Sequence, residues 1–408
     1  METRYFLRDS CRLCLSHRLE LVMALTPTPL CDAYVQASHL DHPQEVFPLD
    51  LYLCNDCGFV QVGCVVDPEY IYGDYIYVTT SSSGLNAHFE DYARDSVKML
   101  QLEPESLVVD IGSNDGTLLR YFKEYGCQVL GVEPATQIAH AATLVGIQTY
   151  ASYFNDMLVK RILEDRGSAD VITINNTFAN VDRLDIFTDS MIDLLSPEGV
   201  IIIESSYLGD MVSNMVFDFI YHEHYSYLSI LPLEKFFAVR NMKLIGLKHT
   251  ASKGGSMRYY FARVSSRRPI GAEVANWIER ENKSGFNRLN TYRQFEEQIN
   301  GIKNELIDEL RIHNDATIVG YGASATSTTL IYHFGLQDYL NFLVDDNPAK
   351  IGTFSPGLHL PVKSRSALYD ESVDIVLILA WRYAQQIISS HPEYKGRFIV
   401  PLPEVEIT

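Results

Sequence analysis

The sequence is poor in basic residues, and this deficit limits the partners that the protein can have. It has 33 lysines and arginines against 52 aspartates and glutamates, a formal net charge of −19 at pH 7. A surface that binds nucleic acid or anionic lipid needs a basic excess, so neither is expected as a partner. An anionic substrate would therefore need a local basic pocket.

Long apolar runs and low-complexity tracts are also missing. Apolar runs such as Val373–Trp381 are far too short to span a bilayer. The first ten residues lack the apolar core of a signal peptide. A cytoplasmic location is therefore expected. A hydrophobic fraction of 47% over 408 residues is ordinary for a globular protein and predicts two or three domains.

Cysteines are few, and four of the seven form two CxxC pairs, Cys11 with Cys14 and Cys54 with Cys57. A CxxC pair brings two thiolates to one tetrahedral ion, and two pairs complete a four-cysteine zinc site. Such a closed set predicts a structural zinc. Paired disulfides are the competing interpretation, but they are rare in the cytoplasm. A redox role would suit one pair and not two.

A strand-turn-helix pattern is the most informative feature of the chain. An apolar run ends in Asp110, turns through Gly112, Asn114 and Gly116, and re-enters an apolar helix. A second apolar run ends in Glu133, whose carboxylate could accept both hydroxyls of a ribose. This two-part pattern indicates a nucleoside-containing cofactor, with a purely structural turn as the alternative.

The polar residues of this turn discriminate between cofactors. Asn114 stands where a pyrophosphate binder would have glycine, and Asp110 and Asp115 place negative charge where a phosphate would lie. S-adenosylmethionine has no phosphate and carries a sulfonium cation, so it fits this turn better than NAD. Asn175, at the end of a later apolar run, is included in the predicted donor site.

Strands and helices alternate in two parts of the chain. The strands expected in the first part are Leu107–Asp110, Val129–Glu133, Val171–Asn175 and Val200–Glu204. The alternation predicts an α/β fold with a parallel, doubly wound sheet. A second alternating region begins near Ala316, and residues 271–312 between the two parts are expected to form a pair of connecting helices.

The second region contains a GxGxxA turn, Gly320–Ala325, and its next apolar run ends in Asp345. In isolation this pattern is a fair NAD fingerprint. A module that binds another nucleotide ligand and a purely structural module are the alternatives. Tyr321 and Asp345 are the candidate binding residues in this region.

Two further segments carry groups that can do chemistry or bind anions. Ile220–Tyr227 packs two histidines, a glutamate and three tyrosines into eight residues. Imidazole and phenol can exchange protons with a substrate while a carboxylate orients them, which favours an acid/base loop over a metal site or a packed loop. Lys253, Ser256 and Arg258 flank or follow a glycine pair and could meet a phosphate, or form an exposed turn.

Taken together, these motifs resemble those of the nucleotide-sugar C-methyltransferases, which build branched deoxysugars. The resemblance covers essentially the whole chain, and the Tyr221–Tyr225 string and the Val344–Pro348 segment are its more specific parts. It implies a zinc module over residues 1–70, a class I methyltransferase domain over 71–240, and a C-terminal Rossmann-like domain over 241–408. That last domain would help to bind the nucleotide sugar, which turns the interpretation of the GxGxxA element away from NAD.

The resemblance also implies roles for single residues. Tyr221, Glu223 and His224 match the family's catalytic string, and Tyr75 best matches an active-site tyrosine of the upstream aromatic segment. Asn180 is a candidate amide donor to the sugar or its enolate.

Three positions depart from the family pattern. Asn180 and Lys253 stand where histidine is usual, and Thr326 stands where many members have lysine. These departures affect the expected substrate and leave the zinc and donor assignments unchanged.

The implied reaction is methylation at C3 of a nucleotide-linked 4-keto-deoxysugar through an enolate. His224 or Tyr221 would act as the base, with Glu223 orienting the pair. The alternatives are O-methylation of a nucleotide sugar, or an NAD-dependent epimerase or dehydrogenase that uses the C-terminal turn.

Overall fold

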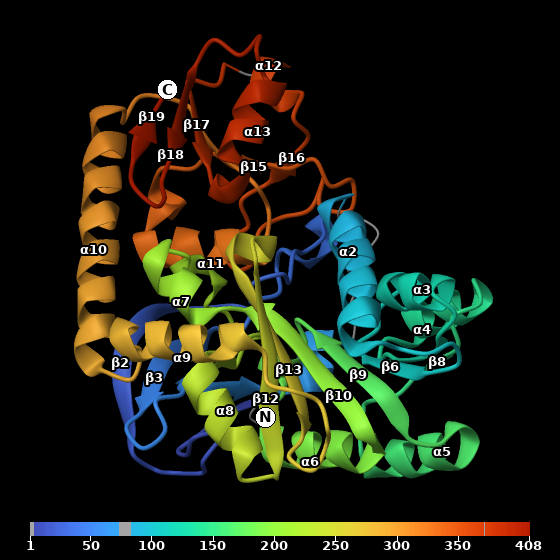
Figure 1. Ribbon diagram of the computed structural model, residues 1–408. Helices are drawn as coiled ribbons and strands as arrows, with labels where there is room; N and C mark the ends of the chain where they lie inside the picture. Colours follow the sequence, from blue (N-terminus) through green and yellow to red (C-terminus); the bar gives the residue numbers. More distant parts are fainter. Residues whose placement is uncertain (1–3, 73–82, 371) are drawn as a thin grey trace.

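The computed structural model describes residues 4–72, 83–370 and 372–408, apart from the side chains of Tyr72, Ser83 and Lys253. Three larger sheets with their helices organise the chain, and Figure 1 shows them as an N-terminal, a central and a C-terminal part. The predicted α/β fold is confirmed.

The N-terminal part is built on a four-stranded antiparallel sheet in the order β11-β4-β3-β2. Its strands are β2 (Leu19–Thr28), β3 (Phe47–Cys54), β4 (Val60–Val62) and β11 (Ser226–Tyr227). A separate antiparallel pair joins β1 (Tyr5–Leu7) to β5 (Cys64–Val66), and η1 (Ala37–His39) and α1 (Pro68–Tyr72) complete the region. Because β11 comes from residues far along the chain, this sheet ties the N-terminal module to the central part.

The central sheet has seven strands in the order β12-β13-β10-β9-β6-β7-β8. Its strands are β6 (Leu107–Ile111), β7 (Gln128–Val132), β8 (Thr149–Tyr150), β9 (Ala169–Asn175), β10 (Leu195–Ser206), β12 (Met242–Thr250) and β13 (Ser256–Arg263). Strands β6 to β10 run parallel, so the ends that carry Asp110 and Asn175 lie at one edge. Crevices at that edge are the usual ligand sites of open α/β sheets.

The helices of the central part cover both sides of this sheet, as Figure 1 shows. They are α2 (Ser83–Leu100), α3 (Thr117–Glu124), α4 (Thr136–Leu144), α5 (Asp156–Arg166), α6 (Leu184–Leu194), α7 (Leu208–Ser213) and α8 (Ile230–Ala238), with η3 (Phe178–Asn180), η4 (Phe217–Phe219) and η5 (Ser252–Gly254). In α3, Leu118, Leu119 and Phe122 are buried at helical spacing. The helix packs against β7 and α2.

The predicted parallel sheet is right for β6 to β10 and wrong at the edge beyond β10. There β13 pairs antiparallel with β10, and β12 pairs antiparallel with β13. The glycines Gly254 and Gly255, both with positive φ, close a short turn between β12 and β13, so no crossover helix is needed. The predicted domain boundary at residue 240 placed these strands in the C-terminal domain. We propose that the central domain extends to Arg263, the end of β13.

The two connecting helices predicted within residues 271–312 are present as α9 (Ala272–Ser284) and α10 (Leu289–Ile312). Apolar side chains bury one stripe of α10: Tyr292, Phe295, Ile299, Leu306 and Leu310. This spacing is that of a surface helix with one face on the core. Figure 1 shows α10 running along one side of the molecule from the central part to the C-terminal part.

The C-terminal part holds a six-stranded sheet in the order β16-β15-β14-β17-β18-β19. Its strands are β14 (Ile318–Tyr321), β15 (Phe342–Val344), β16 (Val362–Lys363), β17 (Ile375–Ile378), β18 (Arg397–Val400) and β19 (Glu406–Ile407). Its helices are α11 (Ala325–Phe334), α12 (Ala367–Asp370) and α13 (Ala384–Ser390), with η6 (Leu336–Asp338) and η7 (Trp381–Tyr383). All strands are parallel except β19. This is the predicted second Rossmann-like sheet.

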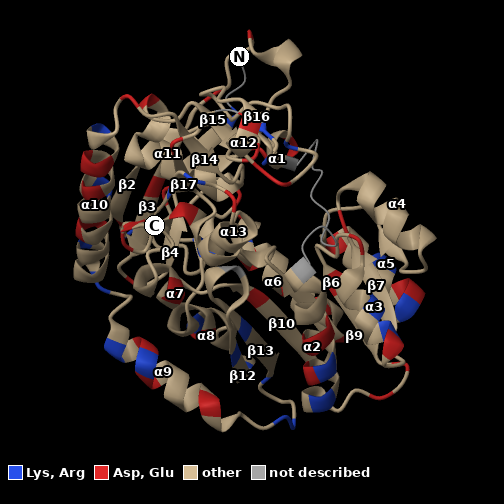
Figure 2. Cartoon of the chain, turned by 90° about the horizontal axis from the view of Figure 1, so that it is seen from above, with Lys and Arg blue, Asp and Glu red and all other residues tan. Residues whose placement is uncertain are grey.

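Surface charge is mixed on the long helices. Figure 2 shows acidic and basic residues interspersed along α2, α9 and α10. Across the residues that the structure describes, no helix combines the length and hydrophobicity that a membrane span requires.

Candidate active site and metal centre

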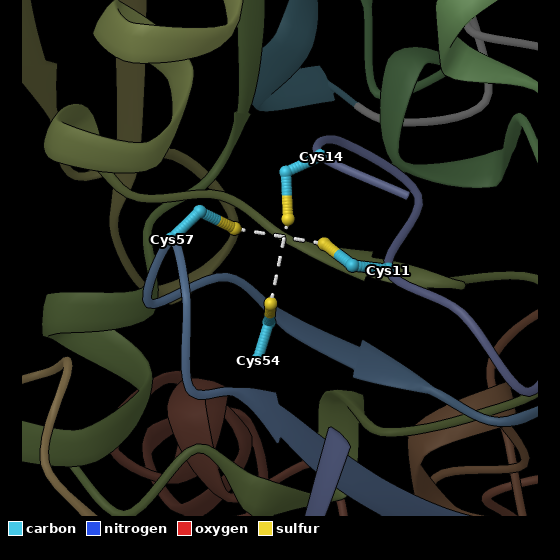
Figure 3. A group of neighbouring side chains, drawn as sticks. All are labelled: Cys11, Cys14, Cys54 and Cys57. Atoms are coloured by element: carbon cyan, nitrogen blue, oxygen red, sulfur yellow. Dashed lines mark hydrogen bonds between the residues drawn. The ribbon is translucent and has the colours of Figure 1, made fainter. Parts of the chain in front are cut away.

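The four cysteines of the two CxxC pairs meet at one point, as Figure 3 shows. Their Sγ atoms all lie within 4.8 Å of one another. The Sγ atoms of Cys11 and Cys57 are 3.6 Å apart, and those of Cys14 and Cys54 are 3.5 Å apart. Sulfurs about 2.3 Å from a tetrahedral zinc would lie roughly 3.8 Å from one another. The cysteines are free thiols, so their spacing fits a zinc ion and not disulfides.

Local turns bring the two pairs together. Cys54 ends β3, and the amide of Gly58 donates to the Cys54 carbonyl at 2.8 Å. Gly58 has φ +80°, and a Cβ there would lie 2.9 Å from the Cβ of Asn287, so glycine is required. When bound, zinc would cross-link the segments that carry the two pairs.

A cavity of about 430 Å³ opens at the carboxyl ends of β6, β7 and β9. It is lined by residues from both predicted sites. The predicted donor residues in its wall are Asp110, Gly112, Asn114, Glu133 and Asn175. The predicted catalytic residues in its wall are Asn180, Tyr221, Glu223 and His224. The fold therefore brings the predicted donor residues Asp110 and Glu133 into one cavity with Tyr221, which follows Glu133 by 88 residues in the sequence.

The turn after β6 needs its glycines for packing. Gly112 has φ +74°, and a Cβ there would lie 2.3 Å from the Thr177 Oγ1. Gly116 lies outside the cavity wall, and a Cβ added at this position would lie 2.8 Å from the Ile147 side chain. Asn114 adopts a left-handed conformation with φ +49°, which asparagine tolerates better than most residues. The residues Gly112, Ser113 and Asn114 of this turn line the cavity.

Glu133 holds the turn through both of its carboxylate oxygens. Its Oε2 accepts the amide N–H of Asn114 at 3.0 Å, and its Oε1 accepts that of Ala135 at 2.9 Å. The side chain is buried, and this burial raises the pKa of Glu133. A carboxylate has about four acceptor sites, so roughly two remain for a ligand.

Asp110 is a buried carboxylate at the end of β6. It accepts hydrogen bonds from Thr173 Oγ1 at 2.6 Å and from Asn175 Nδ2 at 3.4 Å. Burial raises the pKa of Asp110 to about 7. A nearby cation would favour the ionised form.

The charged residues of the cavity wall are all acidic. They are Asp110, Glu133, Asp182 and Glu223. No lysine or arginine lines the cavity within the described ranges. This lining suits a cationic ligand and repels an anion, as the sequence of the turn predicted.

The loop after η4 presents Tyr221 and His224 to the cavity as a stacked pair. Their ring centroids are 4.7 Å apart, and the Tyr221 Oη lies 3.4 Å from the His224 Nε2. The amide of His224 donates to the Tyr221 carbonyl at 2.9 Å, which closes a tight turn and places Glu223 between them in the chain. A phenol and an imidazole at this separation can share or pass a proton.

The second histidine of the same string points elsewhere. The His222 Nε2 lies 3.1 Å from the carbonyl of Pro48, and its ring packs on Phe47. Burial lowers the pKa of His222 to about 4, so it stays neutral. This histidine fixes the loop to β3.

The predicted anion-binding segment lies outside the cavity. Arg258 on β13 donates to the Glu204 Oε2 at 2.7 Å, and its guanidinium lies 3.4 Å over the Tyr92 ring. The Oε1 of Glu204 lies 2.5 Å from the His88 Nε2. The Ser256 Oγ donates to the Ser252 carbonyl. These contacts are internal, so a substrate role for Ser256 and Arg258 stays a prediction.

The C-terminal candidates also lie apart from the cavity. The Tyr321 Oη donates to the Asp346 Oδ2 at 2.9 Å and lies 3.1 Å from the His391 Nε2. The Asp345 Oδ2 accepts the Ala323 amide at 2.6 Å, which occupies a donor that a pyrophosphate would use. A substrate role for Tyr321 and Asp345 therefore stays a prediction.

Two predicted side chains lie outside the described residues, and several residues of the cavity region were not predicted. Tyr75 and the side chain of Lys253 lie outside the described part of the chain. Among the residues that were not predicted are Asp182, which lines the cavity, and Arg12, which is buried and paired with Asp182. The position of Asp182 just after Asn180 was the available signal.

Comparison with known proteins identifies the enzyme class. Three family profiles match: "Putative zinc binding domain" over residues 11–72, "Methyltransferase domain" over 86–246 and "C-methyltransferase C-terminal domain" over 251–403. The chain is 29% identical over 406 residues to the C-methyltransferase NovU of Streptomyces niveus, covering 98% of this chain and 96% of NovU. The chain is an S-adenosylmethionine-dependent C-methyltransferase, which confirms the predicted enzyme class and methyl donor.

Solved structures show more distant similarity. The PH0226 protein of Pyrococcus horikoshii OT3 is 13% identical with a TM-score of 0.37, covering 48% of this chain and 98% of its own. The magnesium protoporphyrin IX methyltransferase ChlM of Synechocystis PCC 6803 is 12% identical with a TM-score of 0.34, covering 48% of this chain and 88% of its own.

Proposed function

We propose that the enzyme methylates C3 of a nucleotide-linked 4-keto-deoxysugar through an enolate. The observation that carries this proposal is that one cavity holds both the Asp110–Glu133 donor residues and the Tyr221–His224 pair. Methyl transfer to carbon requires the reacting carbon and the methyl group to be held close to contact. A shared cavity meets that requirement.

The donor side of the cavity is assigned to the ends of β6 and β7. The two remaining acceptor sites of Glu133 would take the two ribose hydroxyls, and the Gly112 turn would lie along the methionine part. Asp110 would face the positive charge of the donor. When bound, S-adenosylmethionine supplies the electrophilic methyl group.

The acceptor side is assigned to the Tyr221–His224 turn and Asn180. The 4-keto group acidifies the C3 hydrogen, and His224 or Tyr221 removes it as a proton. The electron pair of the broken C–H bond moves into the enolate, and the Asn180 amide would donate a hydrogen bond to the enolate oxygen. Glu223 orients the pair. The C3 carbon then forms its bond to methyl as the bond from methyl to sulfur breaks.

The nucleotide part of the substrate is assigned outside this cavity. A diphosphate would be repelled by the acidic wall, which has no lysine or arginine within the described ranges. We propose that the keto-sugar enters the cavity while the nucleotide extends toward the C-terminal Rossmann-like domain. The division into a zinc module, a methyltransferase domain and this third domain is part of the same proposal.

The test is methyl transfer from a labelled donor to a panel of nucleotide 4-keto-deoxysugars, read by mass spectrometry. Magnetic resonance of the product then locates the methyl group on carbon or oxygen. His224→Ala and Tyr221→Phe should each lower the rate by about 10²–10⁴-fold, the usual contribution of an acid/base group. His140→Ala, an exposed histidine on α4, is the matched control. Transfer to oxygen, or full activity in both loop variants, would contradict the proposal.

A further inference from the structure

We propose that Arg12, which lies between the two cysteines of the first CxxC pair, is a positioning residue for the methyl-transfer cavity. Its guanidinium ties two walls of the cavity to the four-cysteine cluster. The proposal rests on the proposed function, because it assigns one of those walls to the catalytic turn.

Arg12 is fully buried, with 0% of its surface exposed. Its Nε donates to the Asp182 Oδ1 at 3.1 Å. Its Nη1 donates to the carbonyl of Val62 at 2.7 Å and to the carbonyl of Tyr225 at 3.4 Å. The guanidinium also lies 5.0 Å over the ring of Tyr225. One side chain thus contacts three separate segments of the chain.

Two of these segments carry candidate active-site residues. Asp182 lines the cavity and follows Asn180 by two residues, and Tyr225 lines the cavity directly after His224. The planar guanidinium, with donors in a fixed fork, holds the two walls at a set separation. A shift of Arg12 would therefore move the proposed enolate donor relative to the proposed base.

The zinc module fixes the backbone of Arg12. Its amide donates to the buried Gln61 Oε1 at 2.8 Å, and the Gln61 Nε2 donates to the Ser10 carbonyl at 3.0 Å. Gln61 lies on β4, opposite Ser226 of β11, which begins two residues after His224. Cys11 and Cys14 hold the same short segment from both sides. The cluster, Arg12 and the catalytic turn therefore form one continuous set of contacts.

Arg8 provides an internal comparison. Its Nη1 lies 3.0 Å and 2.9 Å from the two carboxylate oxygens of Asp182, and its Nε donates to the Ser10 carbonyl. Arg8 therefore shares the Asp182 contact without the contact to Tyr225 that the structure gives Arg12. Arg8→Met should loosen one wall, whereas Arg12→Met should loosen both.

The experiment compares Arg12→Met and Arg8→Met with Arg18→Met, whose exposed ion pair with Asp56 lies on the surface beside the cluster. Each variant is assayed for zinc content, S-adenosylhomocysteine affinity, methylation kinetics and amide hydrogen exchange. Arg12→Met should keep zinc and keep donor affinity within about twofold, because the donor residues are untouched. Its kcat should fall roughly 100-fold, the usual effect of a small misplacement of reacting groups.

Amide hydrogen exchange tests, without any substrate, whether Arg12 holds the two cavity walls. In Arg12→Met, peptides covering residues 176–182 and 221–225 should both exchange about tenfold faster, the effect of losing a hydrogen bond. In Arg8→Met only the first peptide should change, and in Arg18→Met neither. Unchanged exchange of the second peptide in Arg12→Met, or a wild-type kcat, would overturn the inference.

Two further arms separate the possible failures. If Arg12→Met does not fold, Arg12→Lys takes its place, because lysine keeps the positive charge beside Asp182. This variant should still show faster amide exchange at residues 221–225, since lysine lacks the forked N–H donors of the guanidinium. Unchanged exchange there would again overturn the inference. If the wild type fails to methylate any keto-sugar, the proposed function fails, while the exchange data still decide whether Arg12 holds both walls.

Discussion

Replacing Glu133 should weaken donor binding by an amount that follows from its hydrogen bonds. The amides of Asn114 and Ala135 already occupy two acceptor sites of the carboxylate, which leaves about two of four for the ribose hydroxyls. A hydrogen bond to a charged group contributes about 1.5–3 kcal/mol, and water competes for part of this in the empty cavity. Glu133→Ala should therefore cost about 1–3 kcal/mol of binding free energy, roughly 5–150-fold in Kd.

Calorimetry with S-adenosylhomocysteine and with its 2′-deoxy analogue isolates the hydroxyl contact. In the wild type, removing the 2′-hydroxyl should weaken binding by about tenfold, the effect of one hydrogen bond. In Glu133→Ala the two ligands should bind alike, because the partner of the hydroxyl is gone. The loss of binding free energy on removing the 2′-hydroxyl, in the wild type minus that in Glu133→Ala, is the coupling energy between Glu133 and the 2′-hydroxyl.

Stability and specificity controls belong to the same experiment. Glu133→Gln keeps the size of the side chain but leaves one backbone N–H facing an amide N–H₂, so its melting temperature should be measured alongside its affinity. Glu164→Gln, an exposed glutamate on α5, is the matched control and should bind as the wild type does. Unchanged Kd in Glu133→Ala, or an equal loss for the 2′-deoxy ligand in both proteins, would refute the ribose assignment.

Three other predictions test the cluster, the buried acid and the buried ion pair. Purified protein should contain one zinc per chain, and Cys54→Ser should lose it and unfold at lower temperature, because closed thiolate sites contribute to folding; a metal-free protein of full stability would contradict this. With a pKa of about 7, Asp110 gains its charge as pH rises, so donor affinity should improve up to about tenfold from pH 6 to pH 8. Calorimetry should show this slope in the wild type and not in Asp110→Asn, and the same slope in both would exclude Asp110. Glu204→Gln leaves Arg258 buried without its counter-charge and should lower the free energy of unfolding by about 3–5 kcal/mol in urea titrations; a loss no larger than that of the exposed Glu279→Gln would contradict it.

The strands β6 and β7 and the turn after β6 could be predicted because their signals are local. The apolar runs before Asp110 and Glu133 have the length of buried parallel strands, and β6 and β7 lie within one or two residues of the predicted bounds. The glycines between them are required by the close approach of Thr177 and Ile147. The four-cysteine cluster could be predicted because the spacing of two metal ligands within each CxxC pair is a local signal.

Contacts between distant segments could not be predicted. Arg12 and Asp182 are separated by 170 residues, and neither position has a pattern that names the other. The antiparallel β12–β13 hairpin could not be predicted, because a parallel sheet and a mixed sheet begin with the same alternation of strands and helices. The two histidines of the Tyr221–Tyr225 string differ in direction, with His222 turned to β3 and His224 to the cavity. A turn has no periodicity from which side-chain direction could be predicted.

The most direct test of the proposed mechanism is hydrogen exchange at C3 of the keto-sugar in deuterated water, with S-adenosylhomocysteine in place of the methyl donor. S-adenosylhomocysteine fills the donor pocket without supplying a methyl group, so removal of the C3 proton is observed without methyl transfer. The wild type should exchange the C3 hydrogen, and His224→Ala or Tyr221→Phe should slow that exchange by about 10²–10⁴-fold while binding S-adenosylhomocysteine as the wild type does. Undiminished exchange in both variants would contradict the assignment of the base to the Tyr221–His224 pair.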